Sequence, residues 1–186
     1  MKIADKLAET SNRSTSTRRR ILAKVLPVFV YTIFFPALLF VIPKLFLDSW
    51  FGFSTFLTPA VRAVLGGSLI TLGVIFLFWS IRAQRELGKG TPMPLMATQK
   101  LVTQKPYLYC RNPIFFGLIN LFFGISILFN SISSLVMVLI FSVIILFYTR
   151  FIEEKELEIR FGDEYLAYKK GTPFIIPSPT IFRRRK

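Results

Sequence analysis

The sequence has no histidine and only one cysteine, Cys110. Histidine is the commonest general base, metal ligand and pH sensor of proteins. Any chemistry must therefore use carboxylates, tyrosine, lysine, arginine, backbone groups or a bound cofactor. A single cysteine also excludes an internal disulfide and a metal site built from several thiolates. We expect no metal centre.

Acidic residues are scarce as well, with 10 Asp and Glu against 24 Lys and Arg and a net charge of +14. Such a charge would ordinarily suggest a nucleic-acid partner. Here the basic residues flank long apolar runs and form no separate polar domain, which is typical of topology signals and of contacts to anionic headgroups. The charge pattern predicts membrane lipids, and no nucleic acid, as partners.

Apolar residues make up 53% of the 186 residues. In water a single domain of this length would expose much apolar surface, whereas a bilayer acts as its solvent. Residues 25–43 and 63–81 are uncharged runs of 19, each about 28 Å of helix, and 112–149 is twice as long with a polar turn at 130–134. The sequence therefore predicts an all-α polytopic membrane protein with about four transmembrane helices, the last two forming a hairpin.

The distribution of Lys and Arg predicts the orientation in the membrane. Seven lie in residues 1–24, six in 82–111 and nine in 150–186, whereas 44–62 has two and the hairpin turn has none. Cytoplasmic segments of membrane proteins carry such an excess. Both termini and the loop at 82–112 are therefore expected to face the cytoplasm.

The tail is predicted to form a cytoplasmic amphipathic helix over 151–170, because charged and apolar residues are interleaved there. Glu156 and Arg160 are spaced to pair at i,i+4, and Gly162 is a candidate break. The predicted divisions, all within one membrane domain, are a basic flexible arm at 1–24, two transmembrane helices within 25–87, and a loop, hairpin and terminal helix at 88–186.

Asn112-Pro113 is typical of the start of a helix, because Asn caps helices and Pro suits the first helical position. The exposed N–H groups there favour an anion, and Arg111 adds a fixed positive charge. An ordinary capped helix beside an interfacial arginine explains the same residues. Further along, Gly117, Asn120 and Gly124 share one helix face, where simple helix packing is the alternative to a ligand contact.

Glu153 and Glu154 follow the fourth span directly, where a carboxylate opposes the helix dipole. Arg111, Arg150 or a ligand carrying hydroxyl groups, an amine or a sulfonium could compensate, although a solvated start of a charged helix is the simpler alternative. The tyrosines at 107 and 109 could stabilise a sulfonium by cation–π attraction.

In this region the sequence resembles the integral-membrane methyltransferases that include isoprenylcysteine carboxyl methyltransferase and the phospholipid N-methyltransferases. The resemblance covers residues 88–177, about half the chain, in the family's order. The matching motifs are Gly90-Thr91-Pro92, Leu101-Val102, Pro106-Tyr107, Arg111-Asn112-Pro113, Gly117, Glu153-Glu154 and Phe161-Gly162-Asp163-Glu164-Tyr165-Leu166-Ala167-Tyr168.

The resemblance implies methyl transfer from S-adenosylmethionine to a hydrophobic or lipidated acceptor that enters from the bilayer, with Arg111 and Glu154 as the catalytic residues. The enzyme would act mainly by aligning the reactants. An amine acceptor would have to lose a proton, for which Glu153 and Glu154 are local candidates. The implied cofactor-binding residues are Leu101, Val102, Tyr107, Tyr109, Arg111, Asn112, Pro113, Gly117, Glu153 and Glu154.

Several residues depart from the family pattern. Asn112 stands where histidine is common, Lys105 where glycine precedes Pro-Tyr, and Phe174 where arginine often follows the proline. These departures leave the acceptor open between a prenylcysteine carboxylate, a phospholipid amine and other hydrophobic compounds. A related membrane reductase using a nicotinamide cofactor and a non-enzymatic scaffold are the alternative functions, and the sequence leaves the oligomeric state and the source membrane open.

Overall fold

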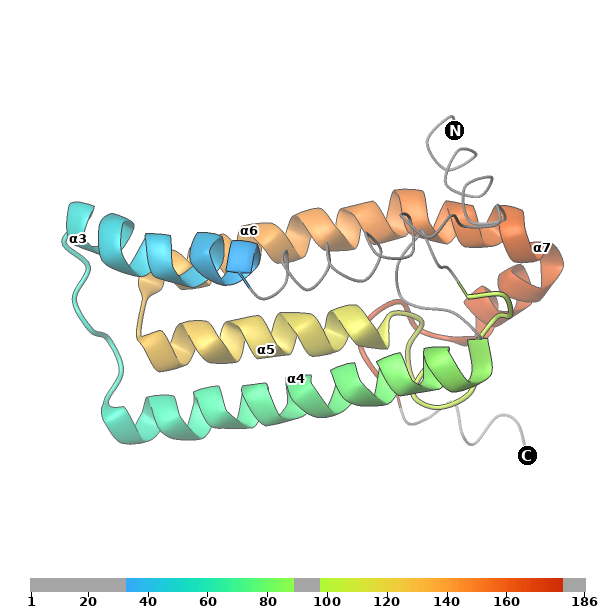
Figure 1. The fold of residues 1–186 in the computed structure, drawn as a ribbon, viewed down its shortest axis with the longest axis horizontal. Helices are drawn as coiled ribbons and strands as arrows, with labels where there is room; N and C mark the ends of the chain where they lie inside the picture. The colour runs from blue at the N-terminus through green and yellow to red at the C-terminus, as the bar shows by residue number, and fades with distance from the viewer. Residues whose placement is uncertain (1–32, 89–97, 179–186) are drawn as a thin grey trace. The chain divides into compact units, whose positions relative to one another are not determined.

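The computed structural model describes residues 33–88 and 98–178, and within these ranges every regular element is helical (Figure 1). The basic arm at 1–24 and the Gly90-Thr91-Pro92 motif lie outside the described residues. The elements are η2 (Ala37–Val41), η3 (Pro43–Leu47), α3 (Asp48–Trp50), α4 (Pro59–Gly88), α5 (Pro113–Phe129), α6 (Ile132–Tyr148), η5 (Thr149–Glu153) and α7 (Glu154–Gly171).

Two of the described helices are long and apolar enough to cross a membrane. They are α4, with 30 residues, and the continuous helix Ile132–Gly171, with 40, while α5 is a shorter apolar helix of 17 residues. These helices indicate a membrane protein. Four spans stay a prediction, because residues 25–32 of the first predicted span lie outside the described ranges. The described part of that span, residues 33–43, is helical.

The chain forms two compact units. The described residues of the first, which we call the site unit, are 76–88, 98–116 and 146–178. Those of the second, the hairpin unit, are 33–75 and 117–145. Helices α4, α5 and α6 contribute residues to both units.

In the hairpin unit, α4 and α5 pack closely at their glycines. A Cβ atom added to Gly73 would lie 2.6 Å from the Leu121 backbone nitrogen and 2.7 Å from the Gly117 carbonyl oxygen, and one added to Gly124 would lie 2.7 Å from the Gly66 carbonyl oxygen. Small residues allow this approach. The small-residue face predicted at Gly117 and Gly124 is thus used for helix packing, against the glycines of α4.

The first prediction compares two glycines of α4. Gly73→Ala should destabilise the protein by about 1–3 kcal/mol, because its methyl group meets backbone atoms that cannot move aside. Gly67 has open space within 4 Å, so Gly67→Ala should be neutral or stabilising by up to about 1 kcal/mol through helix propensity. Melting temperatures of the two purified variants test this packing, and equal shifts would contradict it.

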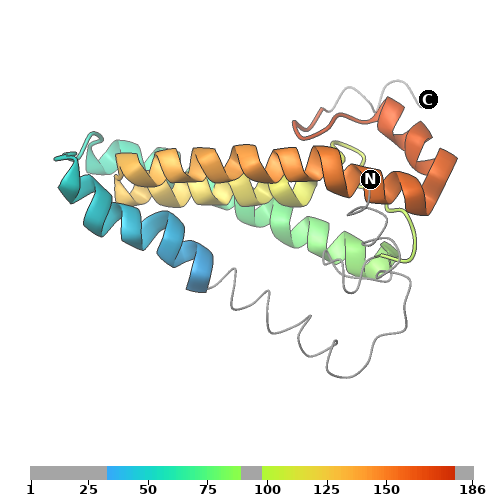
Figure 2. The same cartoon turned by 90° about the horizontal axis from the view of Figure 1, so that it is seen from above.

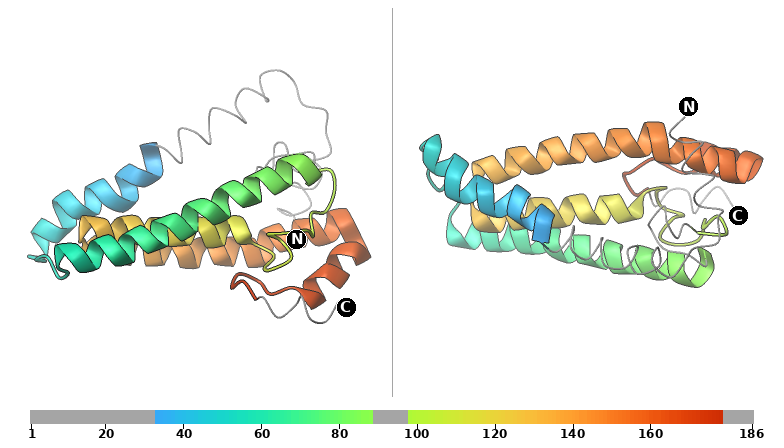
Figure 3. Two further views of the ribbon diagram at one scale, coloured as in Figure 1. Left: turned by 90° about the horizontal axis from the view of Figure 1, so that it is seen from below. Right: turned by 45° about the horizontal axis from the view of Figure 1, so that its top comes forward.

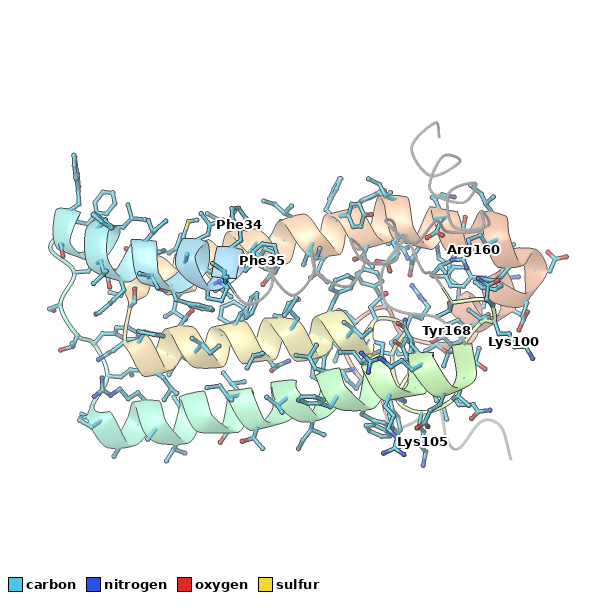
Figure 4. All side chains as sticks on the ribbon, viewed as in Figure 1. Phe34, Phe35, Lys100, Lys105, Arg160 and Tyr168 are labelled. Atoms are coloured by element: carbon cyan, nitrogen blue, oxygen red, sulfur yellow. The ribbon has the colours of Figure 1, made fainter. Side chains whose placement is uncertain are left out.

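Long-range polar contacts fix the turn of the hairpin. Asn130, with a φ of 50°, accepts the N–H groups of Phe56 and Leu57 on its Oδ1 and donates to the Leu57 carbonyl at 3.0 Å. The buried carboxylate of Asp48 accepts the Ser133 N–H at 3.0 Å. The turn is shorter than the predicted 130–134, because α6 already begins at Ile132 and the Asp48 carboxylate satisfies one of its first N–H groups. In the same unit, Phe35, labelled in Figure 4, packs edge-on against Phe141.

The site unit owes its arrangement to a kink inside α7. Gly162 has φ 53° and ψ −130°, and the helix changes direction within its length (Figure 2). Glycine adopts this backbone conformation without the steric cost that a side chain would add. The break predicted at Gly162 is confirmed. The helix ends at Gly171, and the chain then runs back beside residues 109–112, where Arg111 N–H donates to the Pro173 carbonyl and Ser178 N–H to the Tyr109 carbonyl (Figure 3).

Candidate functional site

The centre of the site unit is a buried ion pair between the segment before α5 and the start of α7. The Nε and Nη2 atoms of Arg111 each lie 2.8 Å from Oε1 of Glu154. The Arg111 side chain is 7% exposed and that of Glu154 only 1%. The pair therefore connects two segments 43 residues apart in the chain.

Two further cations converge on the same carboxylate. Nη1 of Arg150 and Nζ of Lys169 both lie 2.8 Å from Oε2 of Glu154, and Lys169 also pairs with Glu158. Arg150 lies four residues before Glu154, whereas Lys169 reaches it from beyond the Gly162 kink. The sequence predicted Arg111 or Arg150 as a partner for the glutamate pair, and both contact Glu154.

Glu154 is held as a carboxylate by these partners. Its burial opposes the charge, but hydrogen bonds and attraction from Lys169 and Arg111 outweigh the burial and keep the pKa of Glu154 below its ordinary value. The glutamate does not end a helix as the sequence suggested, because α6, η5 and α7 are continuous. The negative charge of Glu154 is thus compensated by three basic side chains and not by solvent.

The second prediction concerns this carboxylate. Glu154→Gln should lower the free energy of unfolding by roughly 3–5 kcal/mol, because it leaves the buried Arg111 guanidinium without its counter-ion. The matched control is Glu86→Gln, which removes the exposed pair with Arg82 and should cost less than about 1 kcal/mol. Thermal unfolding of both variants in detergent measures the difference. Equal losses in the free energy of unfolding would contradict the prediction, because they would show that the Glu154 pair stabilises the fold no more than the exposed Glu86 pair does.

The segment after α7 closes over Arg111 through backbone carbonyls. Nη1 of Arg111 donates to the carbonyls of Lys169 and Thr172, and Nδ2 of Asn112 donates to the Phe174 carbonyl at 2.9 Å. Helix α5 begins at Pro113, as predicted. The Phe174 ring centroid lies 5.7 Å from Cζ of Arg111 and 5.6 Å from Cζ of Arg150. The family's arginine is therefore replaced by an aromatic ring that attracts two guanidinium groups.

An aromatic core adjoins this network. Val102, Tyr107, Tyr165 and Tyr168 are buried together with Ala83, and Leu101, Leu157 and Phe161 pack against them. The hydroxyl of Tyr168 donates to the Tyr107 carbonyl at 2.6 Å. At the same end of the unit, Arg160 pairs with Glu156 at 2.9 Å, as predicted, and donates to the Thr98 carbonyl (Figure 4). The 98–112 segment is thus held against both halves of α7.

Among the residues that the structure describes in the site unit, three buried polar atoms lack a hydrogen-bond partner. They are Oε2 of Glu153, the hydroxyl of Tyr107 and Oε1 of Gln84. Buried polar groups are normally paired, so such atoms require an explanation, and an absent ligand is one. The charge of Glu153 is among the influences that raise the pKa of Tyr107 after burial and Tyr168, so these two groups lie close enough to interact. The two adjacent glutamates therefore differ in their partners. Three basic side chains pair with Glu154, and none of these three pairs with Glu153.

Burial raises the pKa of Glu153 from its ordinary 4.5 to about 7, and the charges of Glu156 and Glu154 add to the rise. A carboxyl group with a higher pKa in the folded protein favours folding only while it is protonated. The free energy of unfolding should therefore decrease as the pH rises from about 4.5 to about 7.

The third prediction follows from that sign. Wild-type protein should melt at a lower temperature at about pH 8 than at about pH 5, with Glu153 contributing at most about 3 kcal/mol of the difference. Glu153→Gln should remove this contribution and flatten the profile, because glutamine does not titrate. A variant whose melting temperature falls with pH as steeply as wild type would contradict the assignment.

A cavity of about 350 Å³ lies beside the Glu154 network. It is lined by Arg111, Arg150, Glu158, Leu166, Lys169 and Lys170. Its volume is within the range of small-molecule sites, roughly 300–1,000 Å³. Within residues 33–88 and 98–178, no group of three or more Cys, Asp or Glu side chains is placed to hold a metal ion.

The structure brings most of the sequence-predicted residues into one unit. Those in the site unit are Leu101, Val102, Tyr107, Tyr109, Arg111, Asn112, Pro113, Glu153 and Glu154, whereas Gly117 belongs to the hairpin unit. Sequence reasoning missed Lys169 and Lys170. Their only signal was the Gly162 break, which returns the second half of α7 toward Glu154.

Comparison with known proteins agrees with this arrangement. The sequence model of the phospholipid methyltransferase family matches residues 61–164, which is 104 of the 186 residues. The match begins on α4 and ends in α7, so it includes both segments joined by the Arg111–Glu154 pair. No curated protein matches the chain.

Proposed function

The chain belongs to the phospholipid methyltransferase family, and we propose that it transfers a methyl group from S-adenosylmethionine to an acceptor embedded in the membrane. The observation that carries this proposal is the buried Arg111–Glu154 pair. It joins the Arg-Asn-Pro motif and the Glu-Glu motif, which are the two segments that the resemblance assigns to the cofactor. The family match favours methyl transfer over the nicotinamide-dependent reductase and over a scaffold.

The residues present fit the cofactor. When bound, S-adenosylmethionine supplies a methyl group activated by a sulfonium. Its amino group and its ribose hydroxyls are hydrogen-bond donors, which the unpaired carboxylate oxygen of Glu153 requires, and the unpaired Tyr107 hydroxyl can donate or accept. Aromatic side chains at Tyr107 and Tyr109 suit a sulfonium. Leu101, Val102, Asn112 and Pro113 remain proposed members of the cofactor site.

Arg111 and Glu154 are better suited to positioning than to contact with the reacting atoms. Four of the five N–H groups of Arg111 are used within the protein, by Glu154 and by two carbonyls, and both oxygens of Glu154 are occupied by cations. The pair fixes the segment that carries Tyr107 and Tyr109 against the helix that carries Glu153. Glu153 is therefore the glutamate whose carboxylate is available to a ligand.

The topology expected from the basic residues completes the proposal. With four spans and cytoplasmic termini, the site unit would lie at the cytoplasmic boundary of the bilayer, where a water-soluble cofactor and a lipid acceptor can both arrive. An amphipathic helix, as the sequence predicts over 151–170, would suit such a boundary.

The fourth prediction isolates cofactor binding from folding. Tyr107→Phe removes a buried hydroxyl that has no partner in the protein, so the melting temperature should stay unchanged or rise. Affinity for S-adenosylhomocysteine, measured by calorimetry in detergent, should nevertheless fall about fivefold to tenfold, the usual worth of one hydrogen bond. In the matched control Tyr168→Phe, the lost hydroxyl bonds to the Tyr107 carbonyl, so the melting temperature should fall.

A direct assay accompanies this comparison. Membranes containing the protein are incubated with S-adenosylmethionine labelled in its methyl group, and the extracted lipids are examined for label. Label in a lipid fraction, absent when Glu153→Gln replaces wild type, is the expected result. Folded wild-type protein that neither binds S-adenosylhomocysteine nor labels a lipid would overturn the proposed function.

A further inference from the structure

The cavity beside Glu154 is a shallow, open and basic part of the surface of the site unit. Four of its six lining residues are basic: Arg111, Arg150, Lys169 and Lys170. Two carboxylates, those of Glu154 and Glu158, pair with members of this set, so four positive charges meet two negative ones. An excess of one sign of charge on a surface attracts ligands of the other sign.

Two of these basic residues have donors left for a ligand. Arg150 donates one of its five N–H groups, to Glu154, and its side chain is 46% exposed. Its Cζ lies 5.6 Å from the ring centroid of Phe174, so the guanidinium is held between a carboxylate and an aromatic face. Lys170 is exposed, and within residues 33–88 and 98–178 no carboxylate pairs with it. Arg150 and Lys170 therefore present free donors on an open surface.

The length of the apolar helix before Arg150 indicates how deep this surface lies in a membrane. Residues 132–149 of the continuous helix Ile132–Gly171 carry no charge, and Arg150 is the first charged residue of that helix. These 18 residues cover about 27 Å at 1.5 Å per residue, close to the roughly 30 Å of the hydrocarbon core. Arg150 is therefore expected at the level of the lipid phosphates.

An exposed aromatic pair adjoins Arg150 on the side of the apolar helix. Phe147 is 63% exposed and Phe151 58%, and their ring centroids lie 4.3 Å apart. Phe147 precedes Arg150 by three residues and Phe151 by four, which are the spacings of neighbours on a helix surface. An apolar surface thus continues directly into a cationic one. This combination matches an amphiphile that carries an anionic group at the end of its acyl chains.

We propose that Arg150 and Lys170 bind the phosphate of an anionic phospholipid whose acyl chains lie along Phe147 and Phe151, and that this lipid is a structural ligand and not the methyl acceptor. Charge selects the lipid, because a zwitterionic headgroup carries an ammonium that the same cations repel, whereas a phosphatidylglycerol headgroup carries none. The cavity is not lined by Glu153 or Tyr107, so this lipid leaves the residues proposed for the cofactor unoccupied. The proposal does not depend on methyl transfer.

Binding at this surface should stabilise the fold of the site unit. The phosphate would restrain Arg150, which also pairs with Glu154, and it would lie beside Lys169, a second partner of that carboxylate. A ligand that binds only the folded protein raises its melting temperature. The effect should weaken as the salt concentration rises, because Arg150 and Lys170 are accessible to solvent.

The fifth prediction tests the lipid site with Lys170→Gln, because no ion pair of Lys170 among the described residues would be lost. The full-length protein in a neutral detergent is titrated with phosphatidylglycerol or with phosphatidylcholine of the same chains, and native mass spectrometry measures the bound lipid. The wild type should bind phosphatidylglycerol at least about fivefold more tightly than phosphatidylcholine. Lys170→Gln should weaken phosphatidylglycerol binding about threefold to tenfold and leave phosphatidylcholine binding unchanged.

The matched control is Lys100→Gln, which changes an exposed lysine of the same unit outside the cavity (Figure 4) and should bind both lipids as wild type does. The double variant Arg150→Gln, Lys170→Gln should show no preference between the lipids. A preference that persists in the double variant, or that the wild type lacks, would overturn the proposal. If the double variant does not fold, an unchanged phosphatidylglycerol affinity in Lys170→Gln alone overturns it.

Other ligands separate this lipid from other sources of an anion. If inorganic phosphate raises the melting temperature as much as phosphatidylglycerol does, the surface binds soluble anions and the proposal fails. It fails equally if Lys170→Gln weakens S-adenosylhomocysteine binding and not lipid binding, because the cavity then holds the carboxylate of the cofactor. A wild-type protein that prefers phosphatidylglycerol but does not bind S-adenosylhomocysteine would instead contradict the proposed function and support the lipid site.

Discussion

The burial of one carboxylate, that of Glu154, determines how the site unit is built. A charge with 1% exposure is tolerated only where partners replace its hydration. Those partners come from three separate places: Arg111 before α5, Arg150 one turn earlier and Lys169 beyond the kink. Satisfying this carboxylate therefore brings together segments that the sequence separates widely. The same contacts position Tyr107 and Glu153, because both are attached to the segments so joined.

The neighbouring residues Glu153 and Glu154 have different environments because they face different sides of the helix. Glu154 pairs with cations and has a lowered pKa, whereas Glu153 has a buried, unpaired Oε2 and a pKa raised to about 7. A motif of two identical residues thus contains one carboxylate paired with three cations and one with an unpaired oxygen, which we propose for the cofactor. The cavity lined by Arg111, Arg150 and Lys169 lies next to the carboxylate of Glu154.

Local patterns predicted the elements well. Pro113 begins its helix, Glu156 and Arg160 pair, Gly162 breaks α7 and the face of Gly117 and Gly124 packs against α4. Each of these depends on residues within about one turn of helix or on a face set by helical periodicity, which sequence spacing shows directly.

Contacts across long separations were not predictable from spacing. Nothing near Asn130 indicates that its side chain holds residues 56 and 57, and nothing near Asp48 indicates its bond to Ser133. In the sequence alone, Lys169 looks like an ordinary basic residue in the last turn of a helix. Its approach to Glu154 depends on the direction that the chain takes after Gly162, which a one-dimensional pattern does not contain.

The central claim is that Arg111 and Glu154 interact directly in a buried environment. A double-mutant cycle with Arg111→Gln, Glu154→Gln and the combined variant, followed by thermal unfolding in detergent, measures that interaction. The account predicts a coupling free energy of about 2–3 kcal/mol, with the combined variant far less destabilised than the two single losses added together. Additive losses, within about 0.5 kcal/mol, would show that the two residues do not meet and would contradict the account.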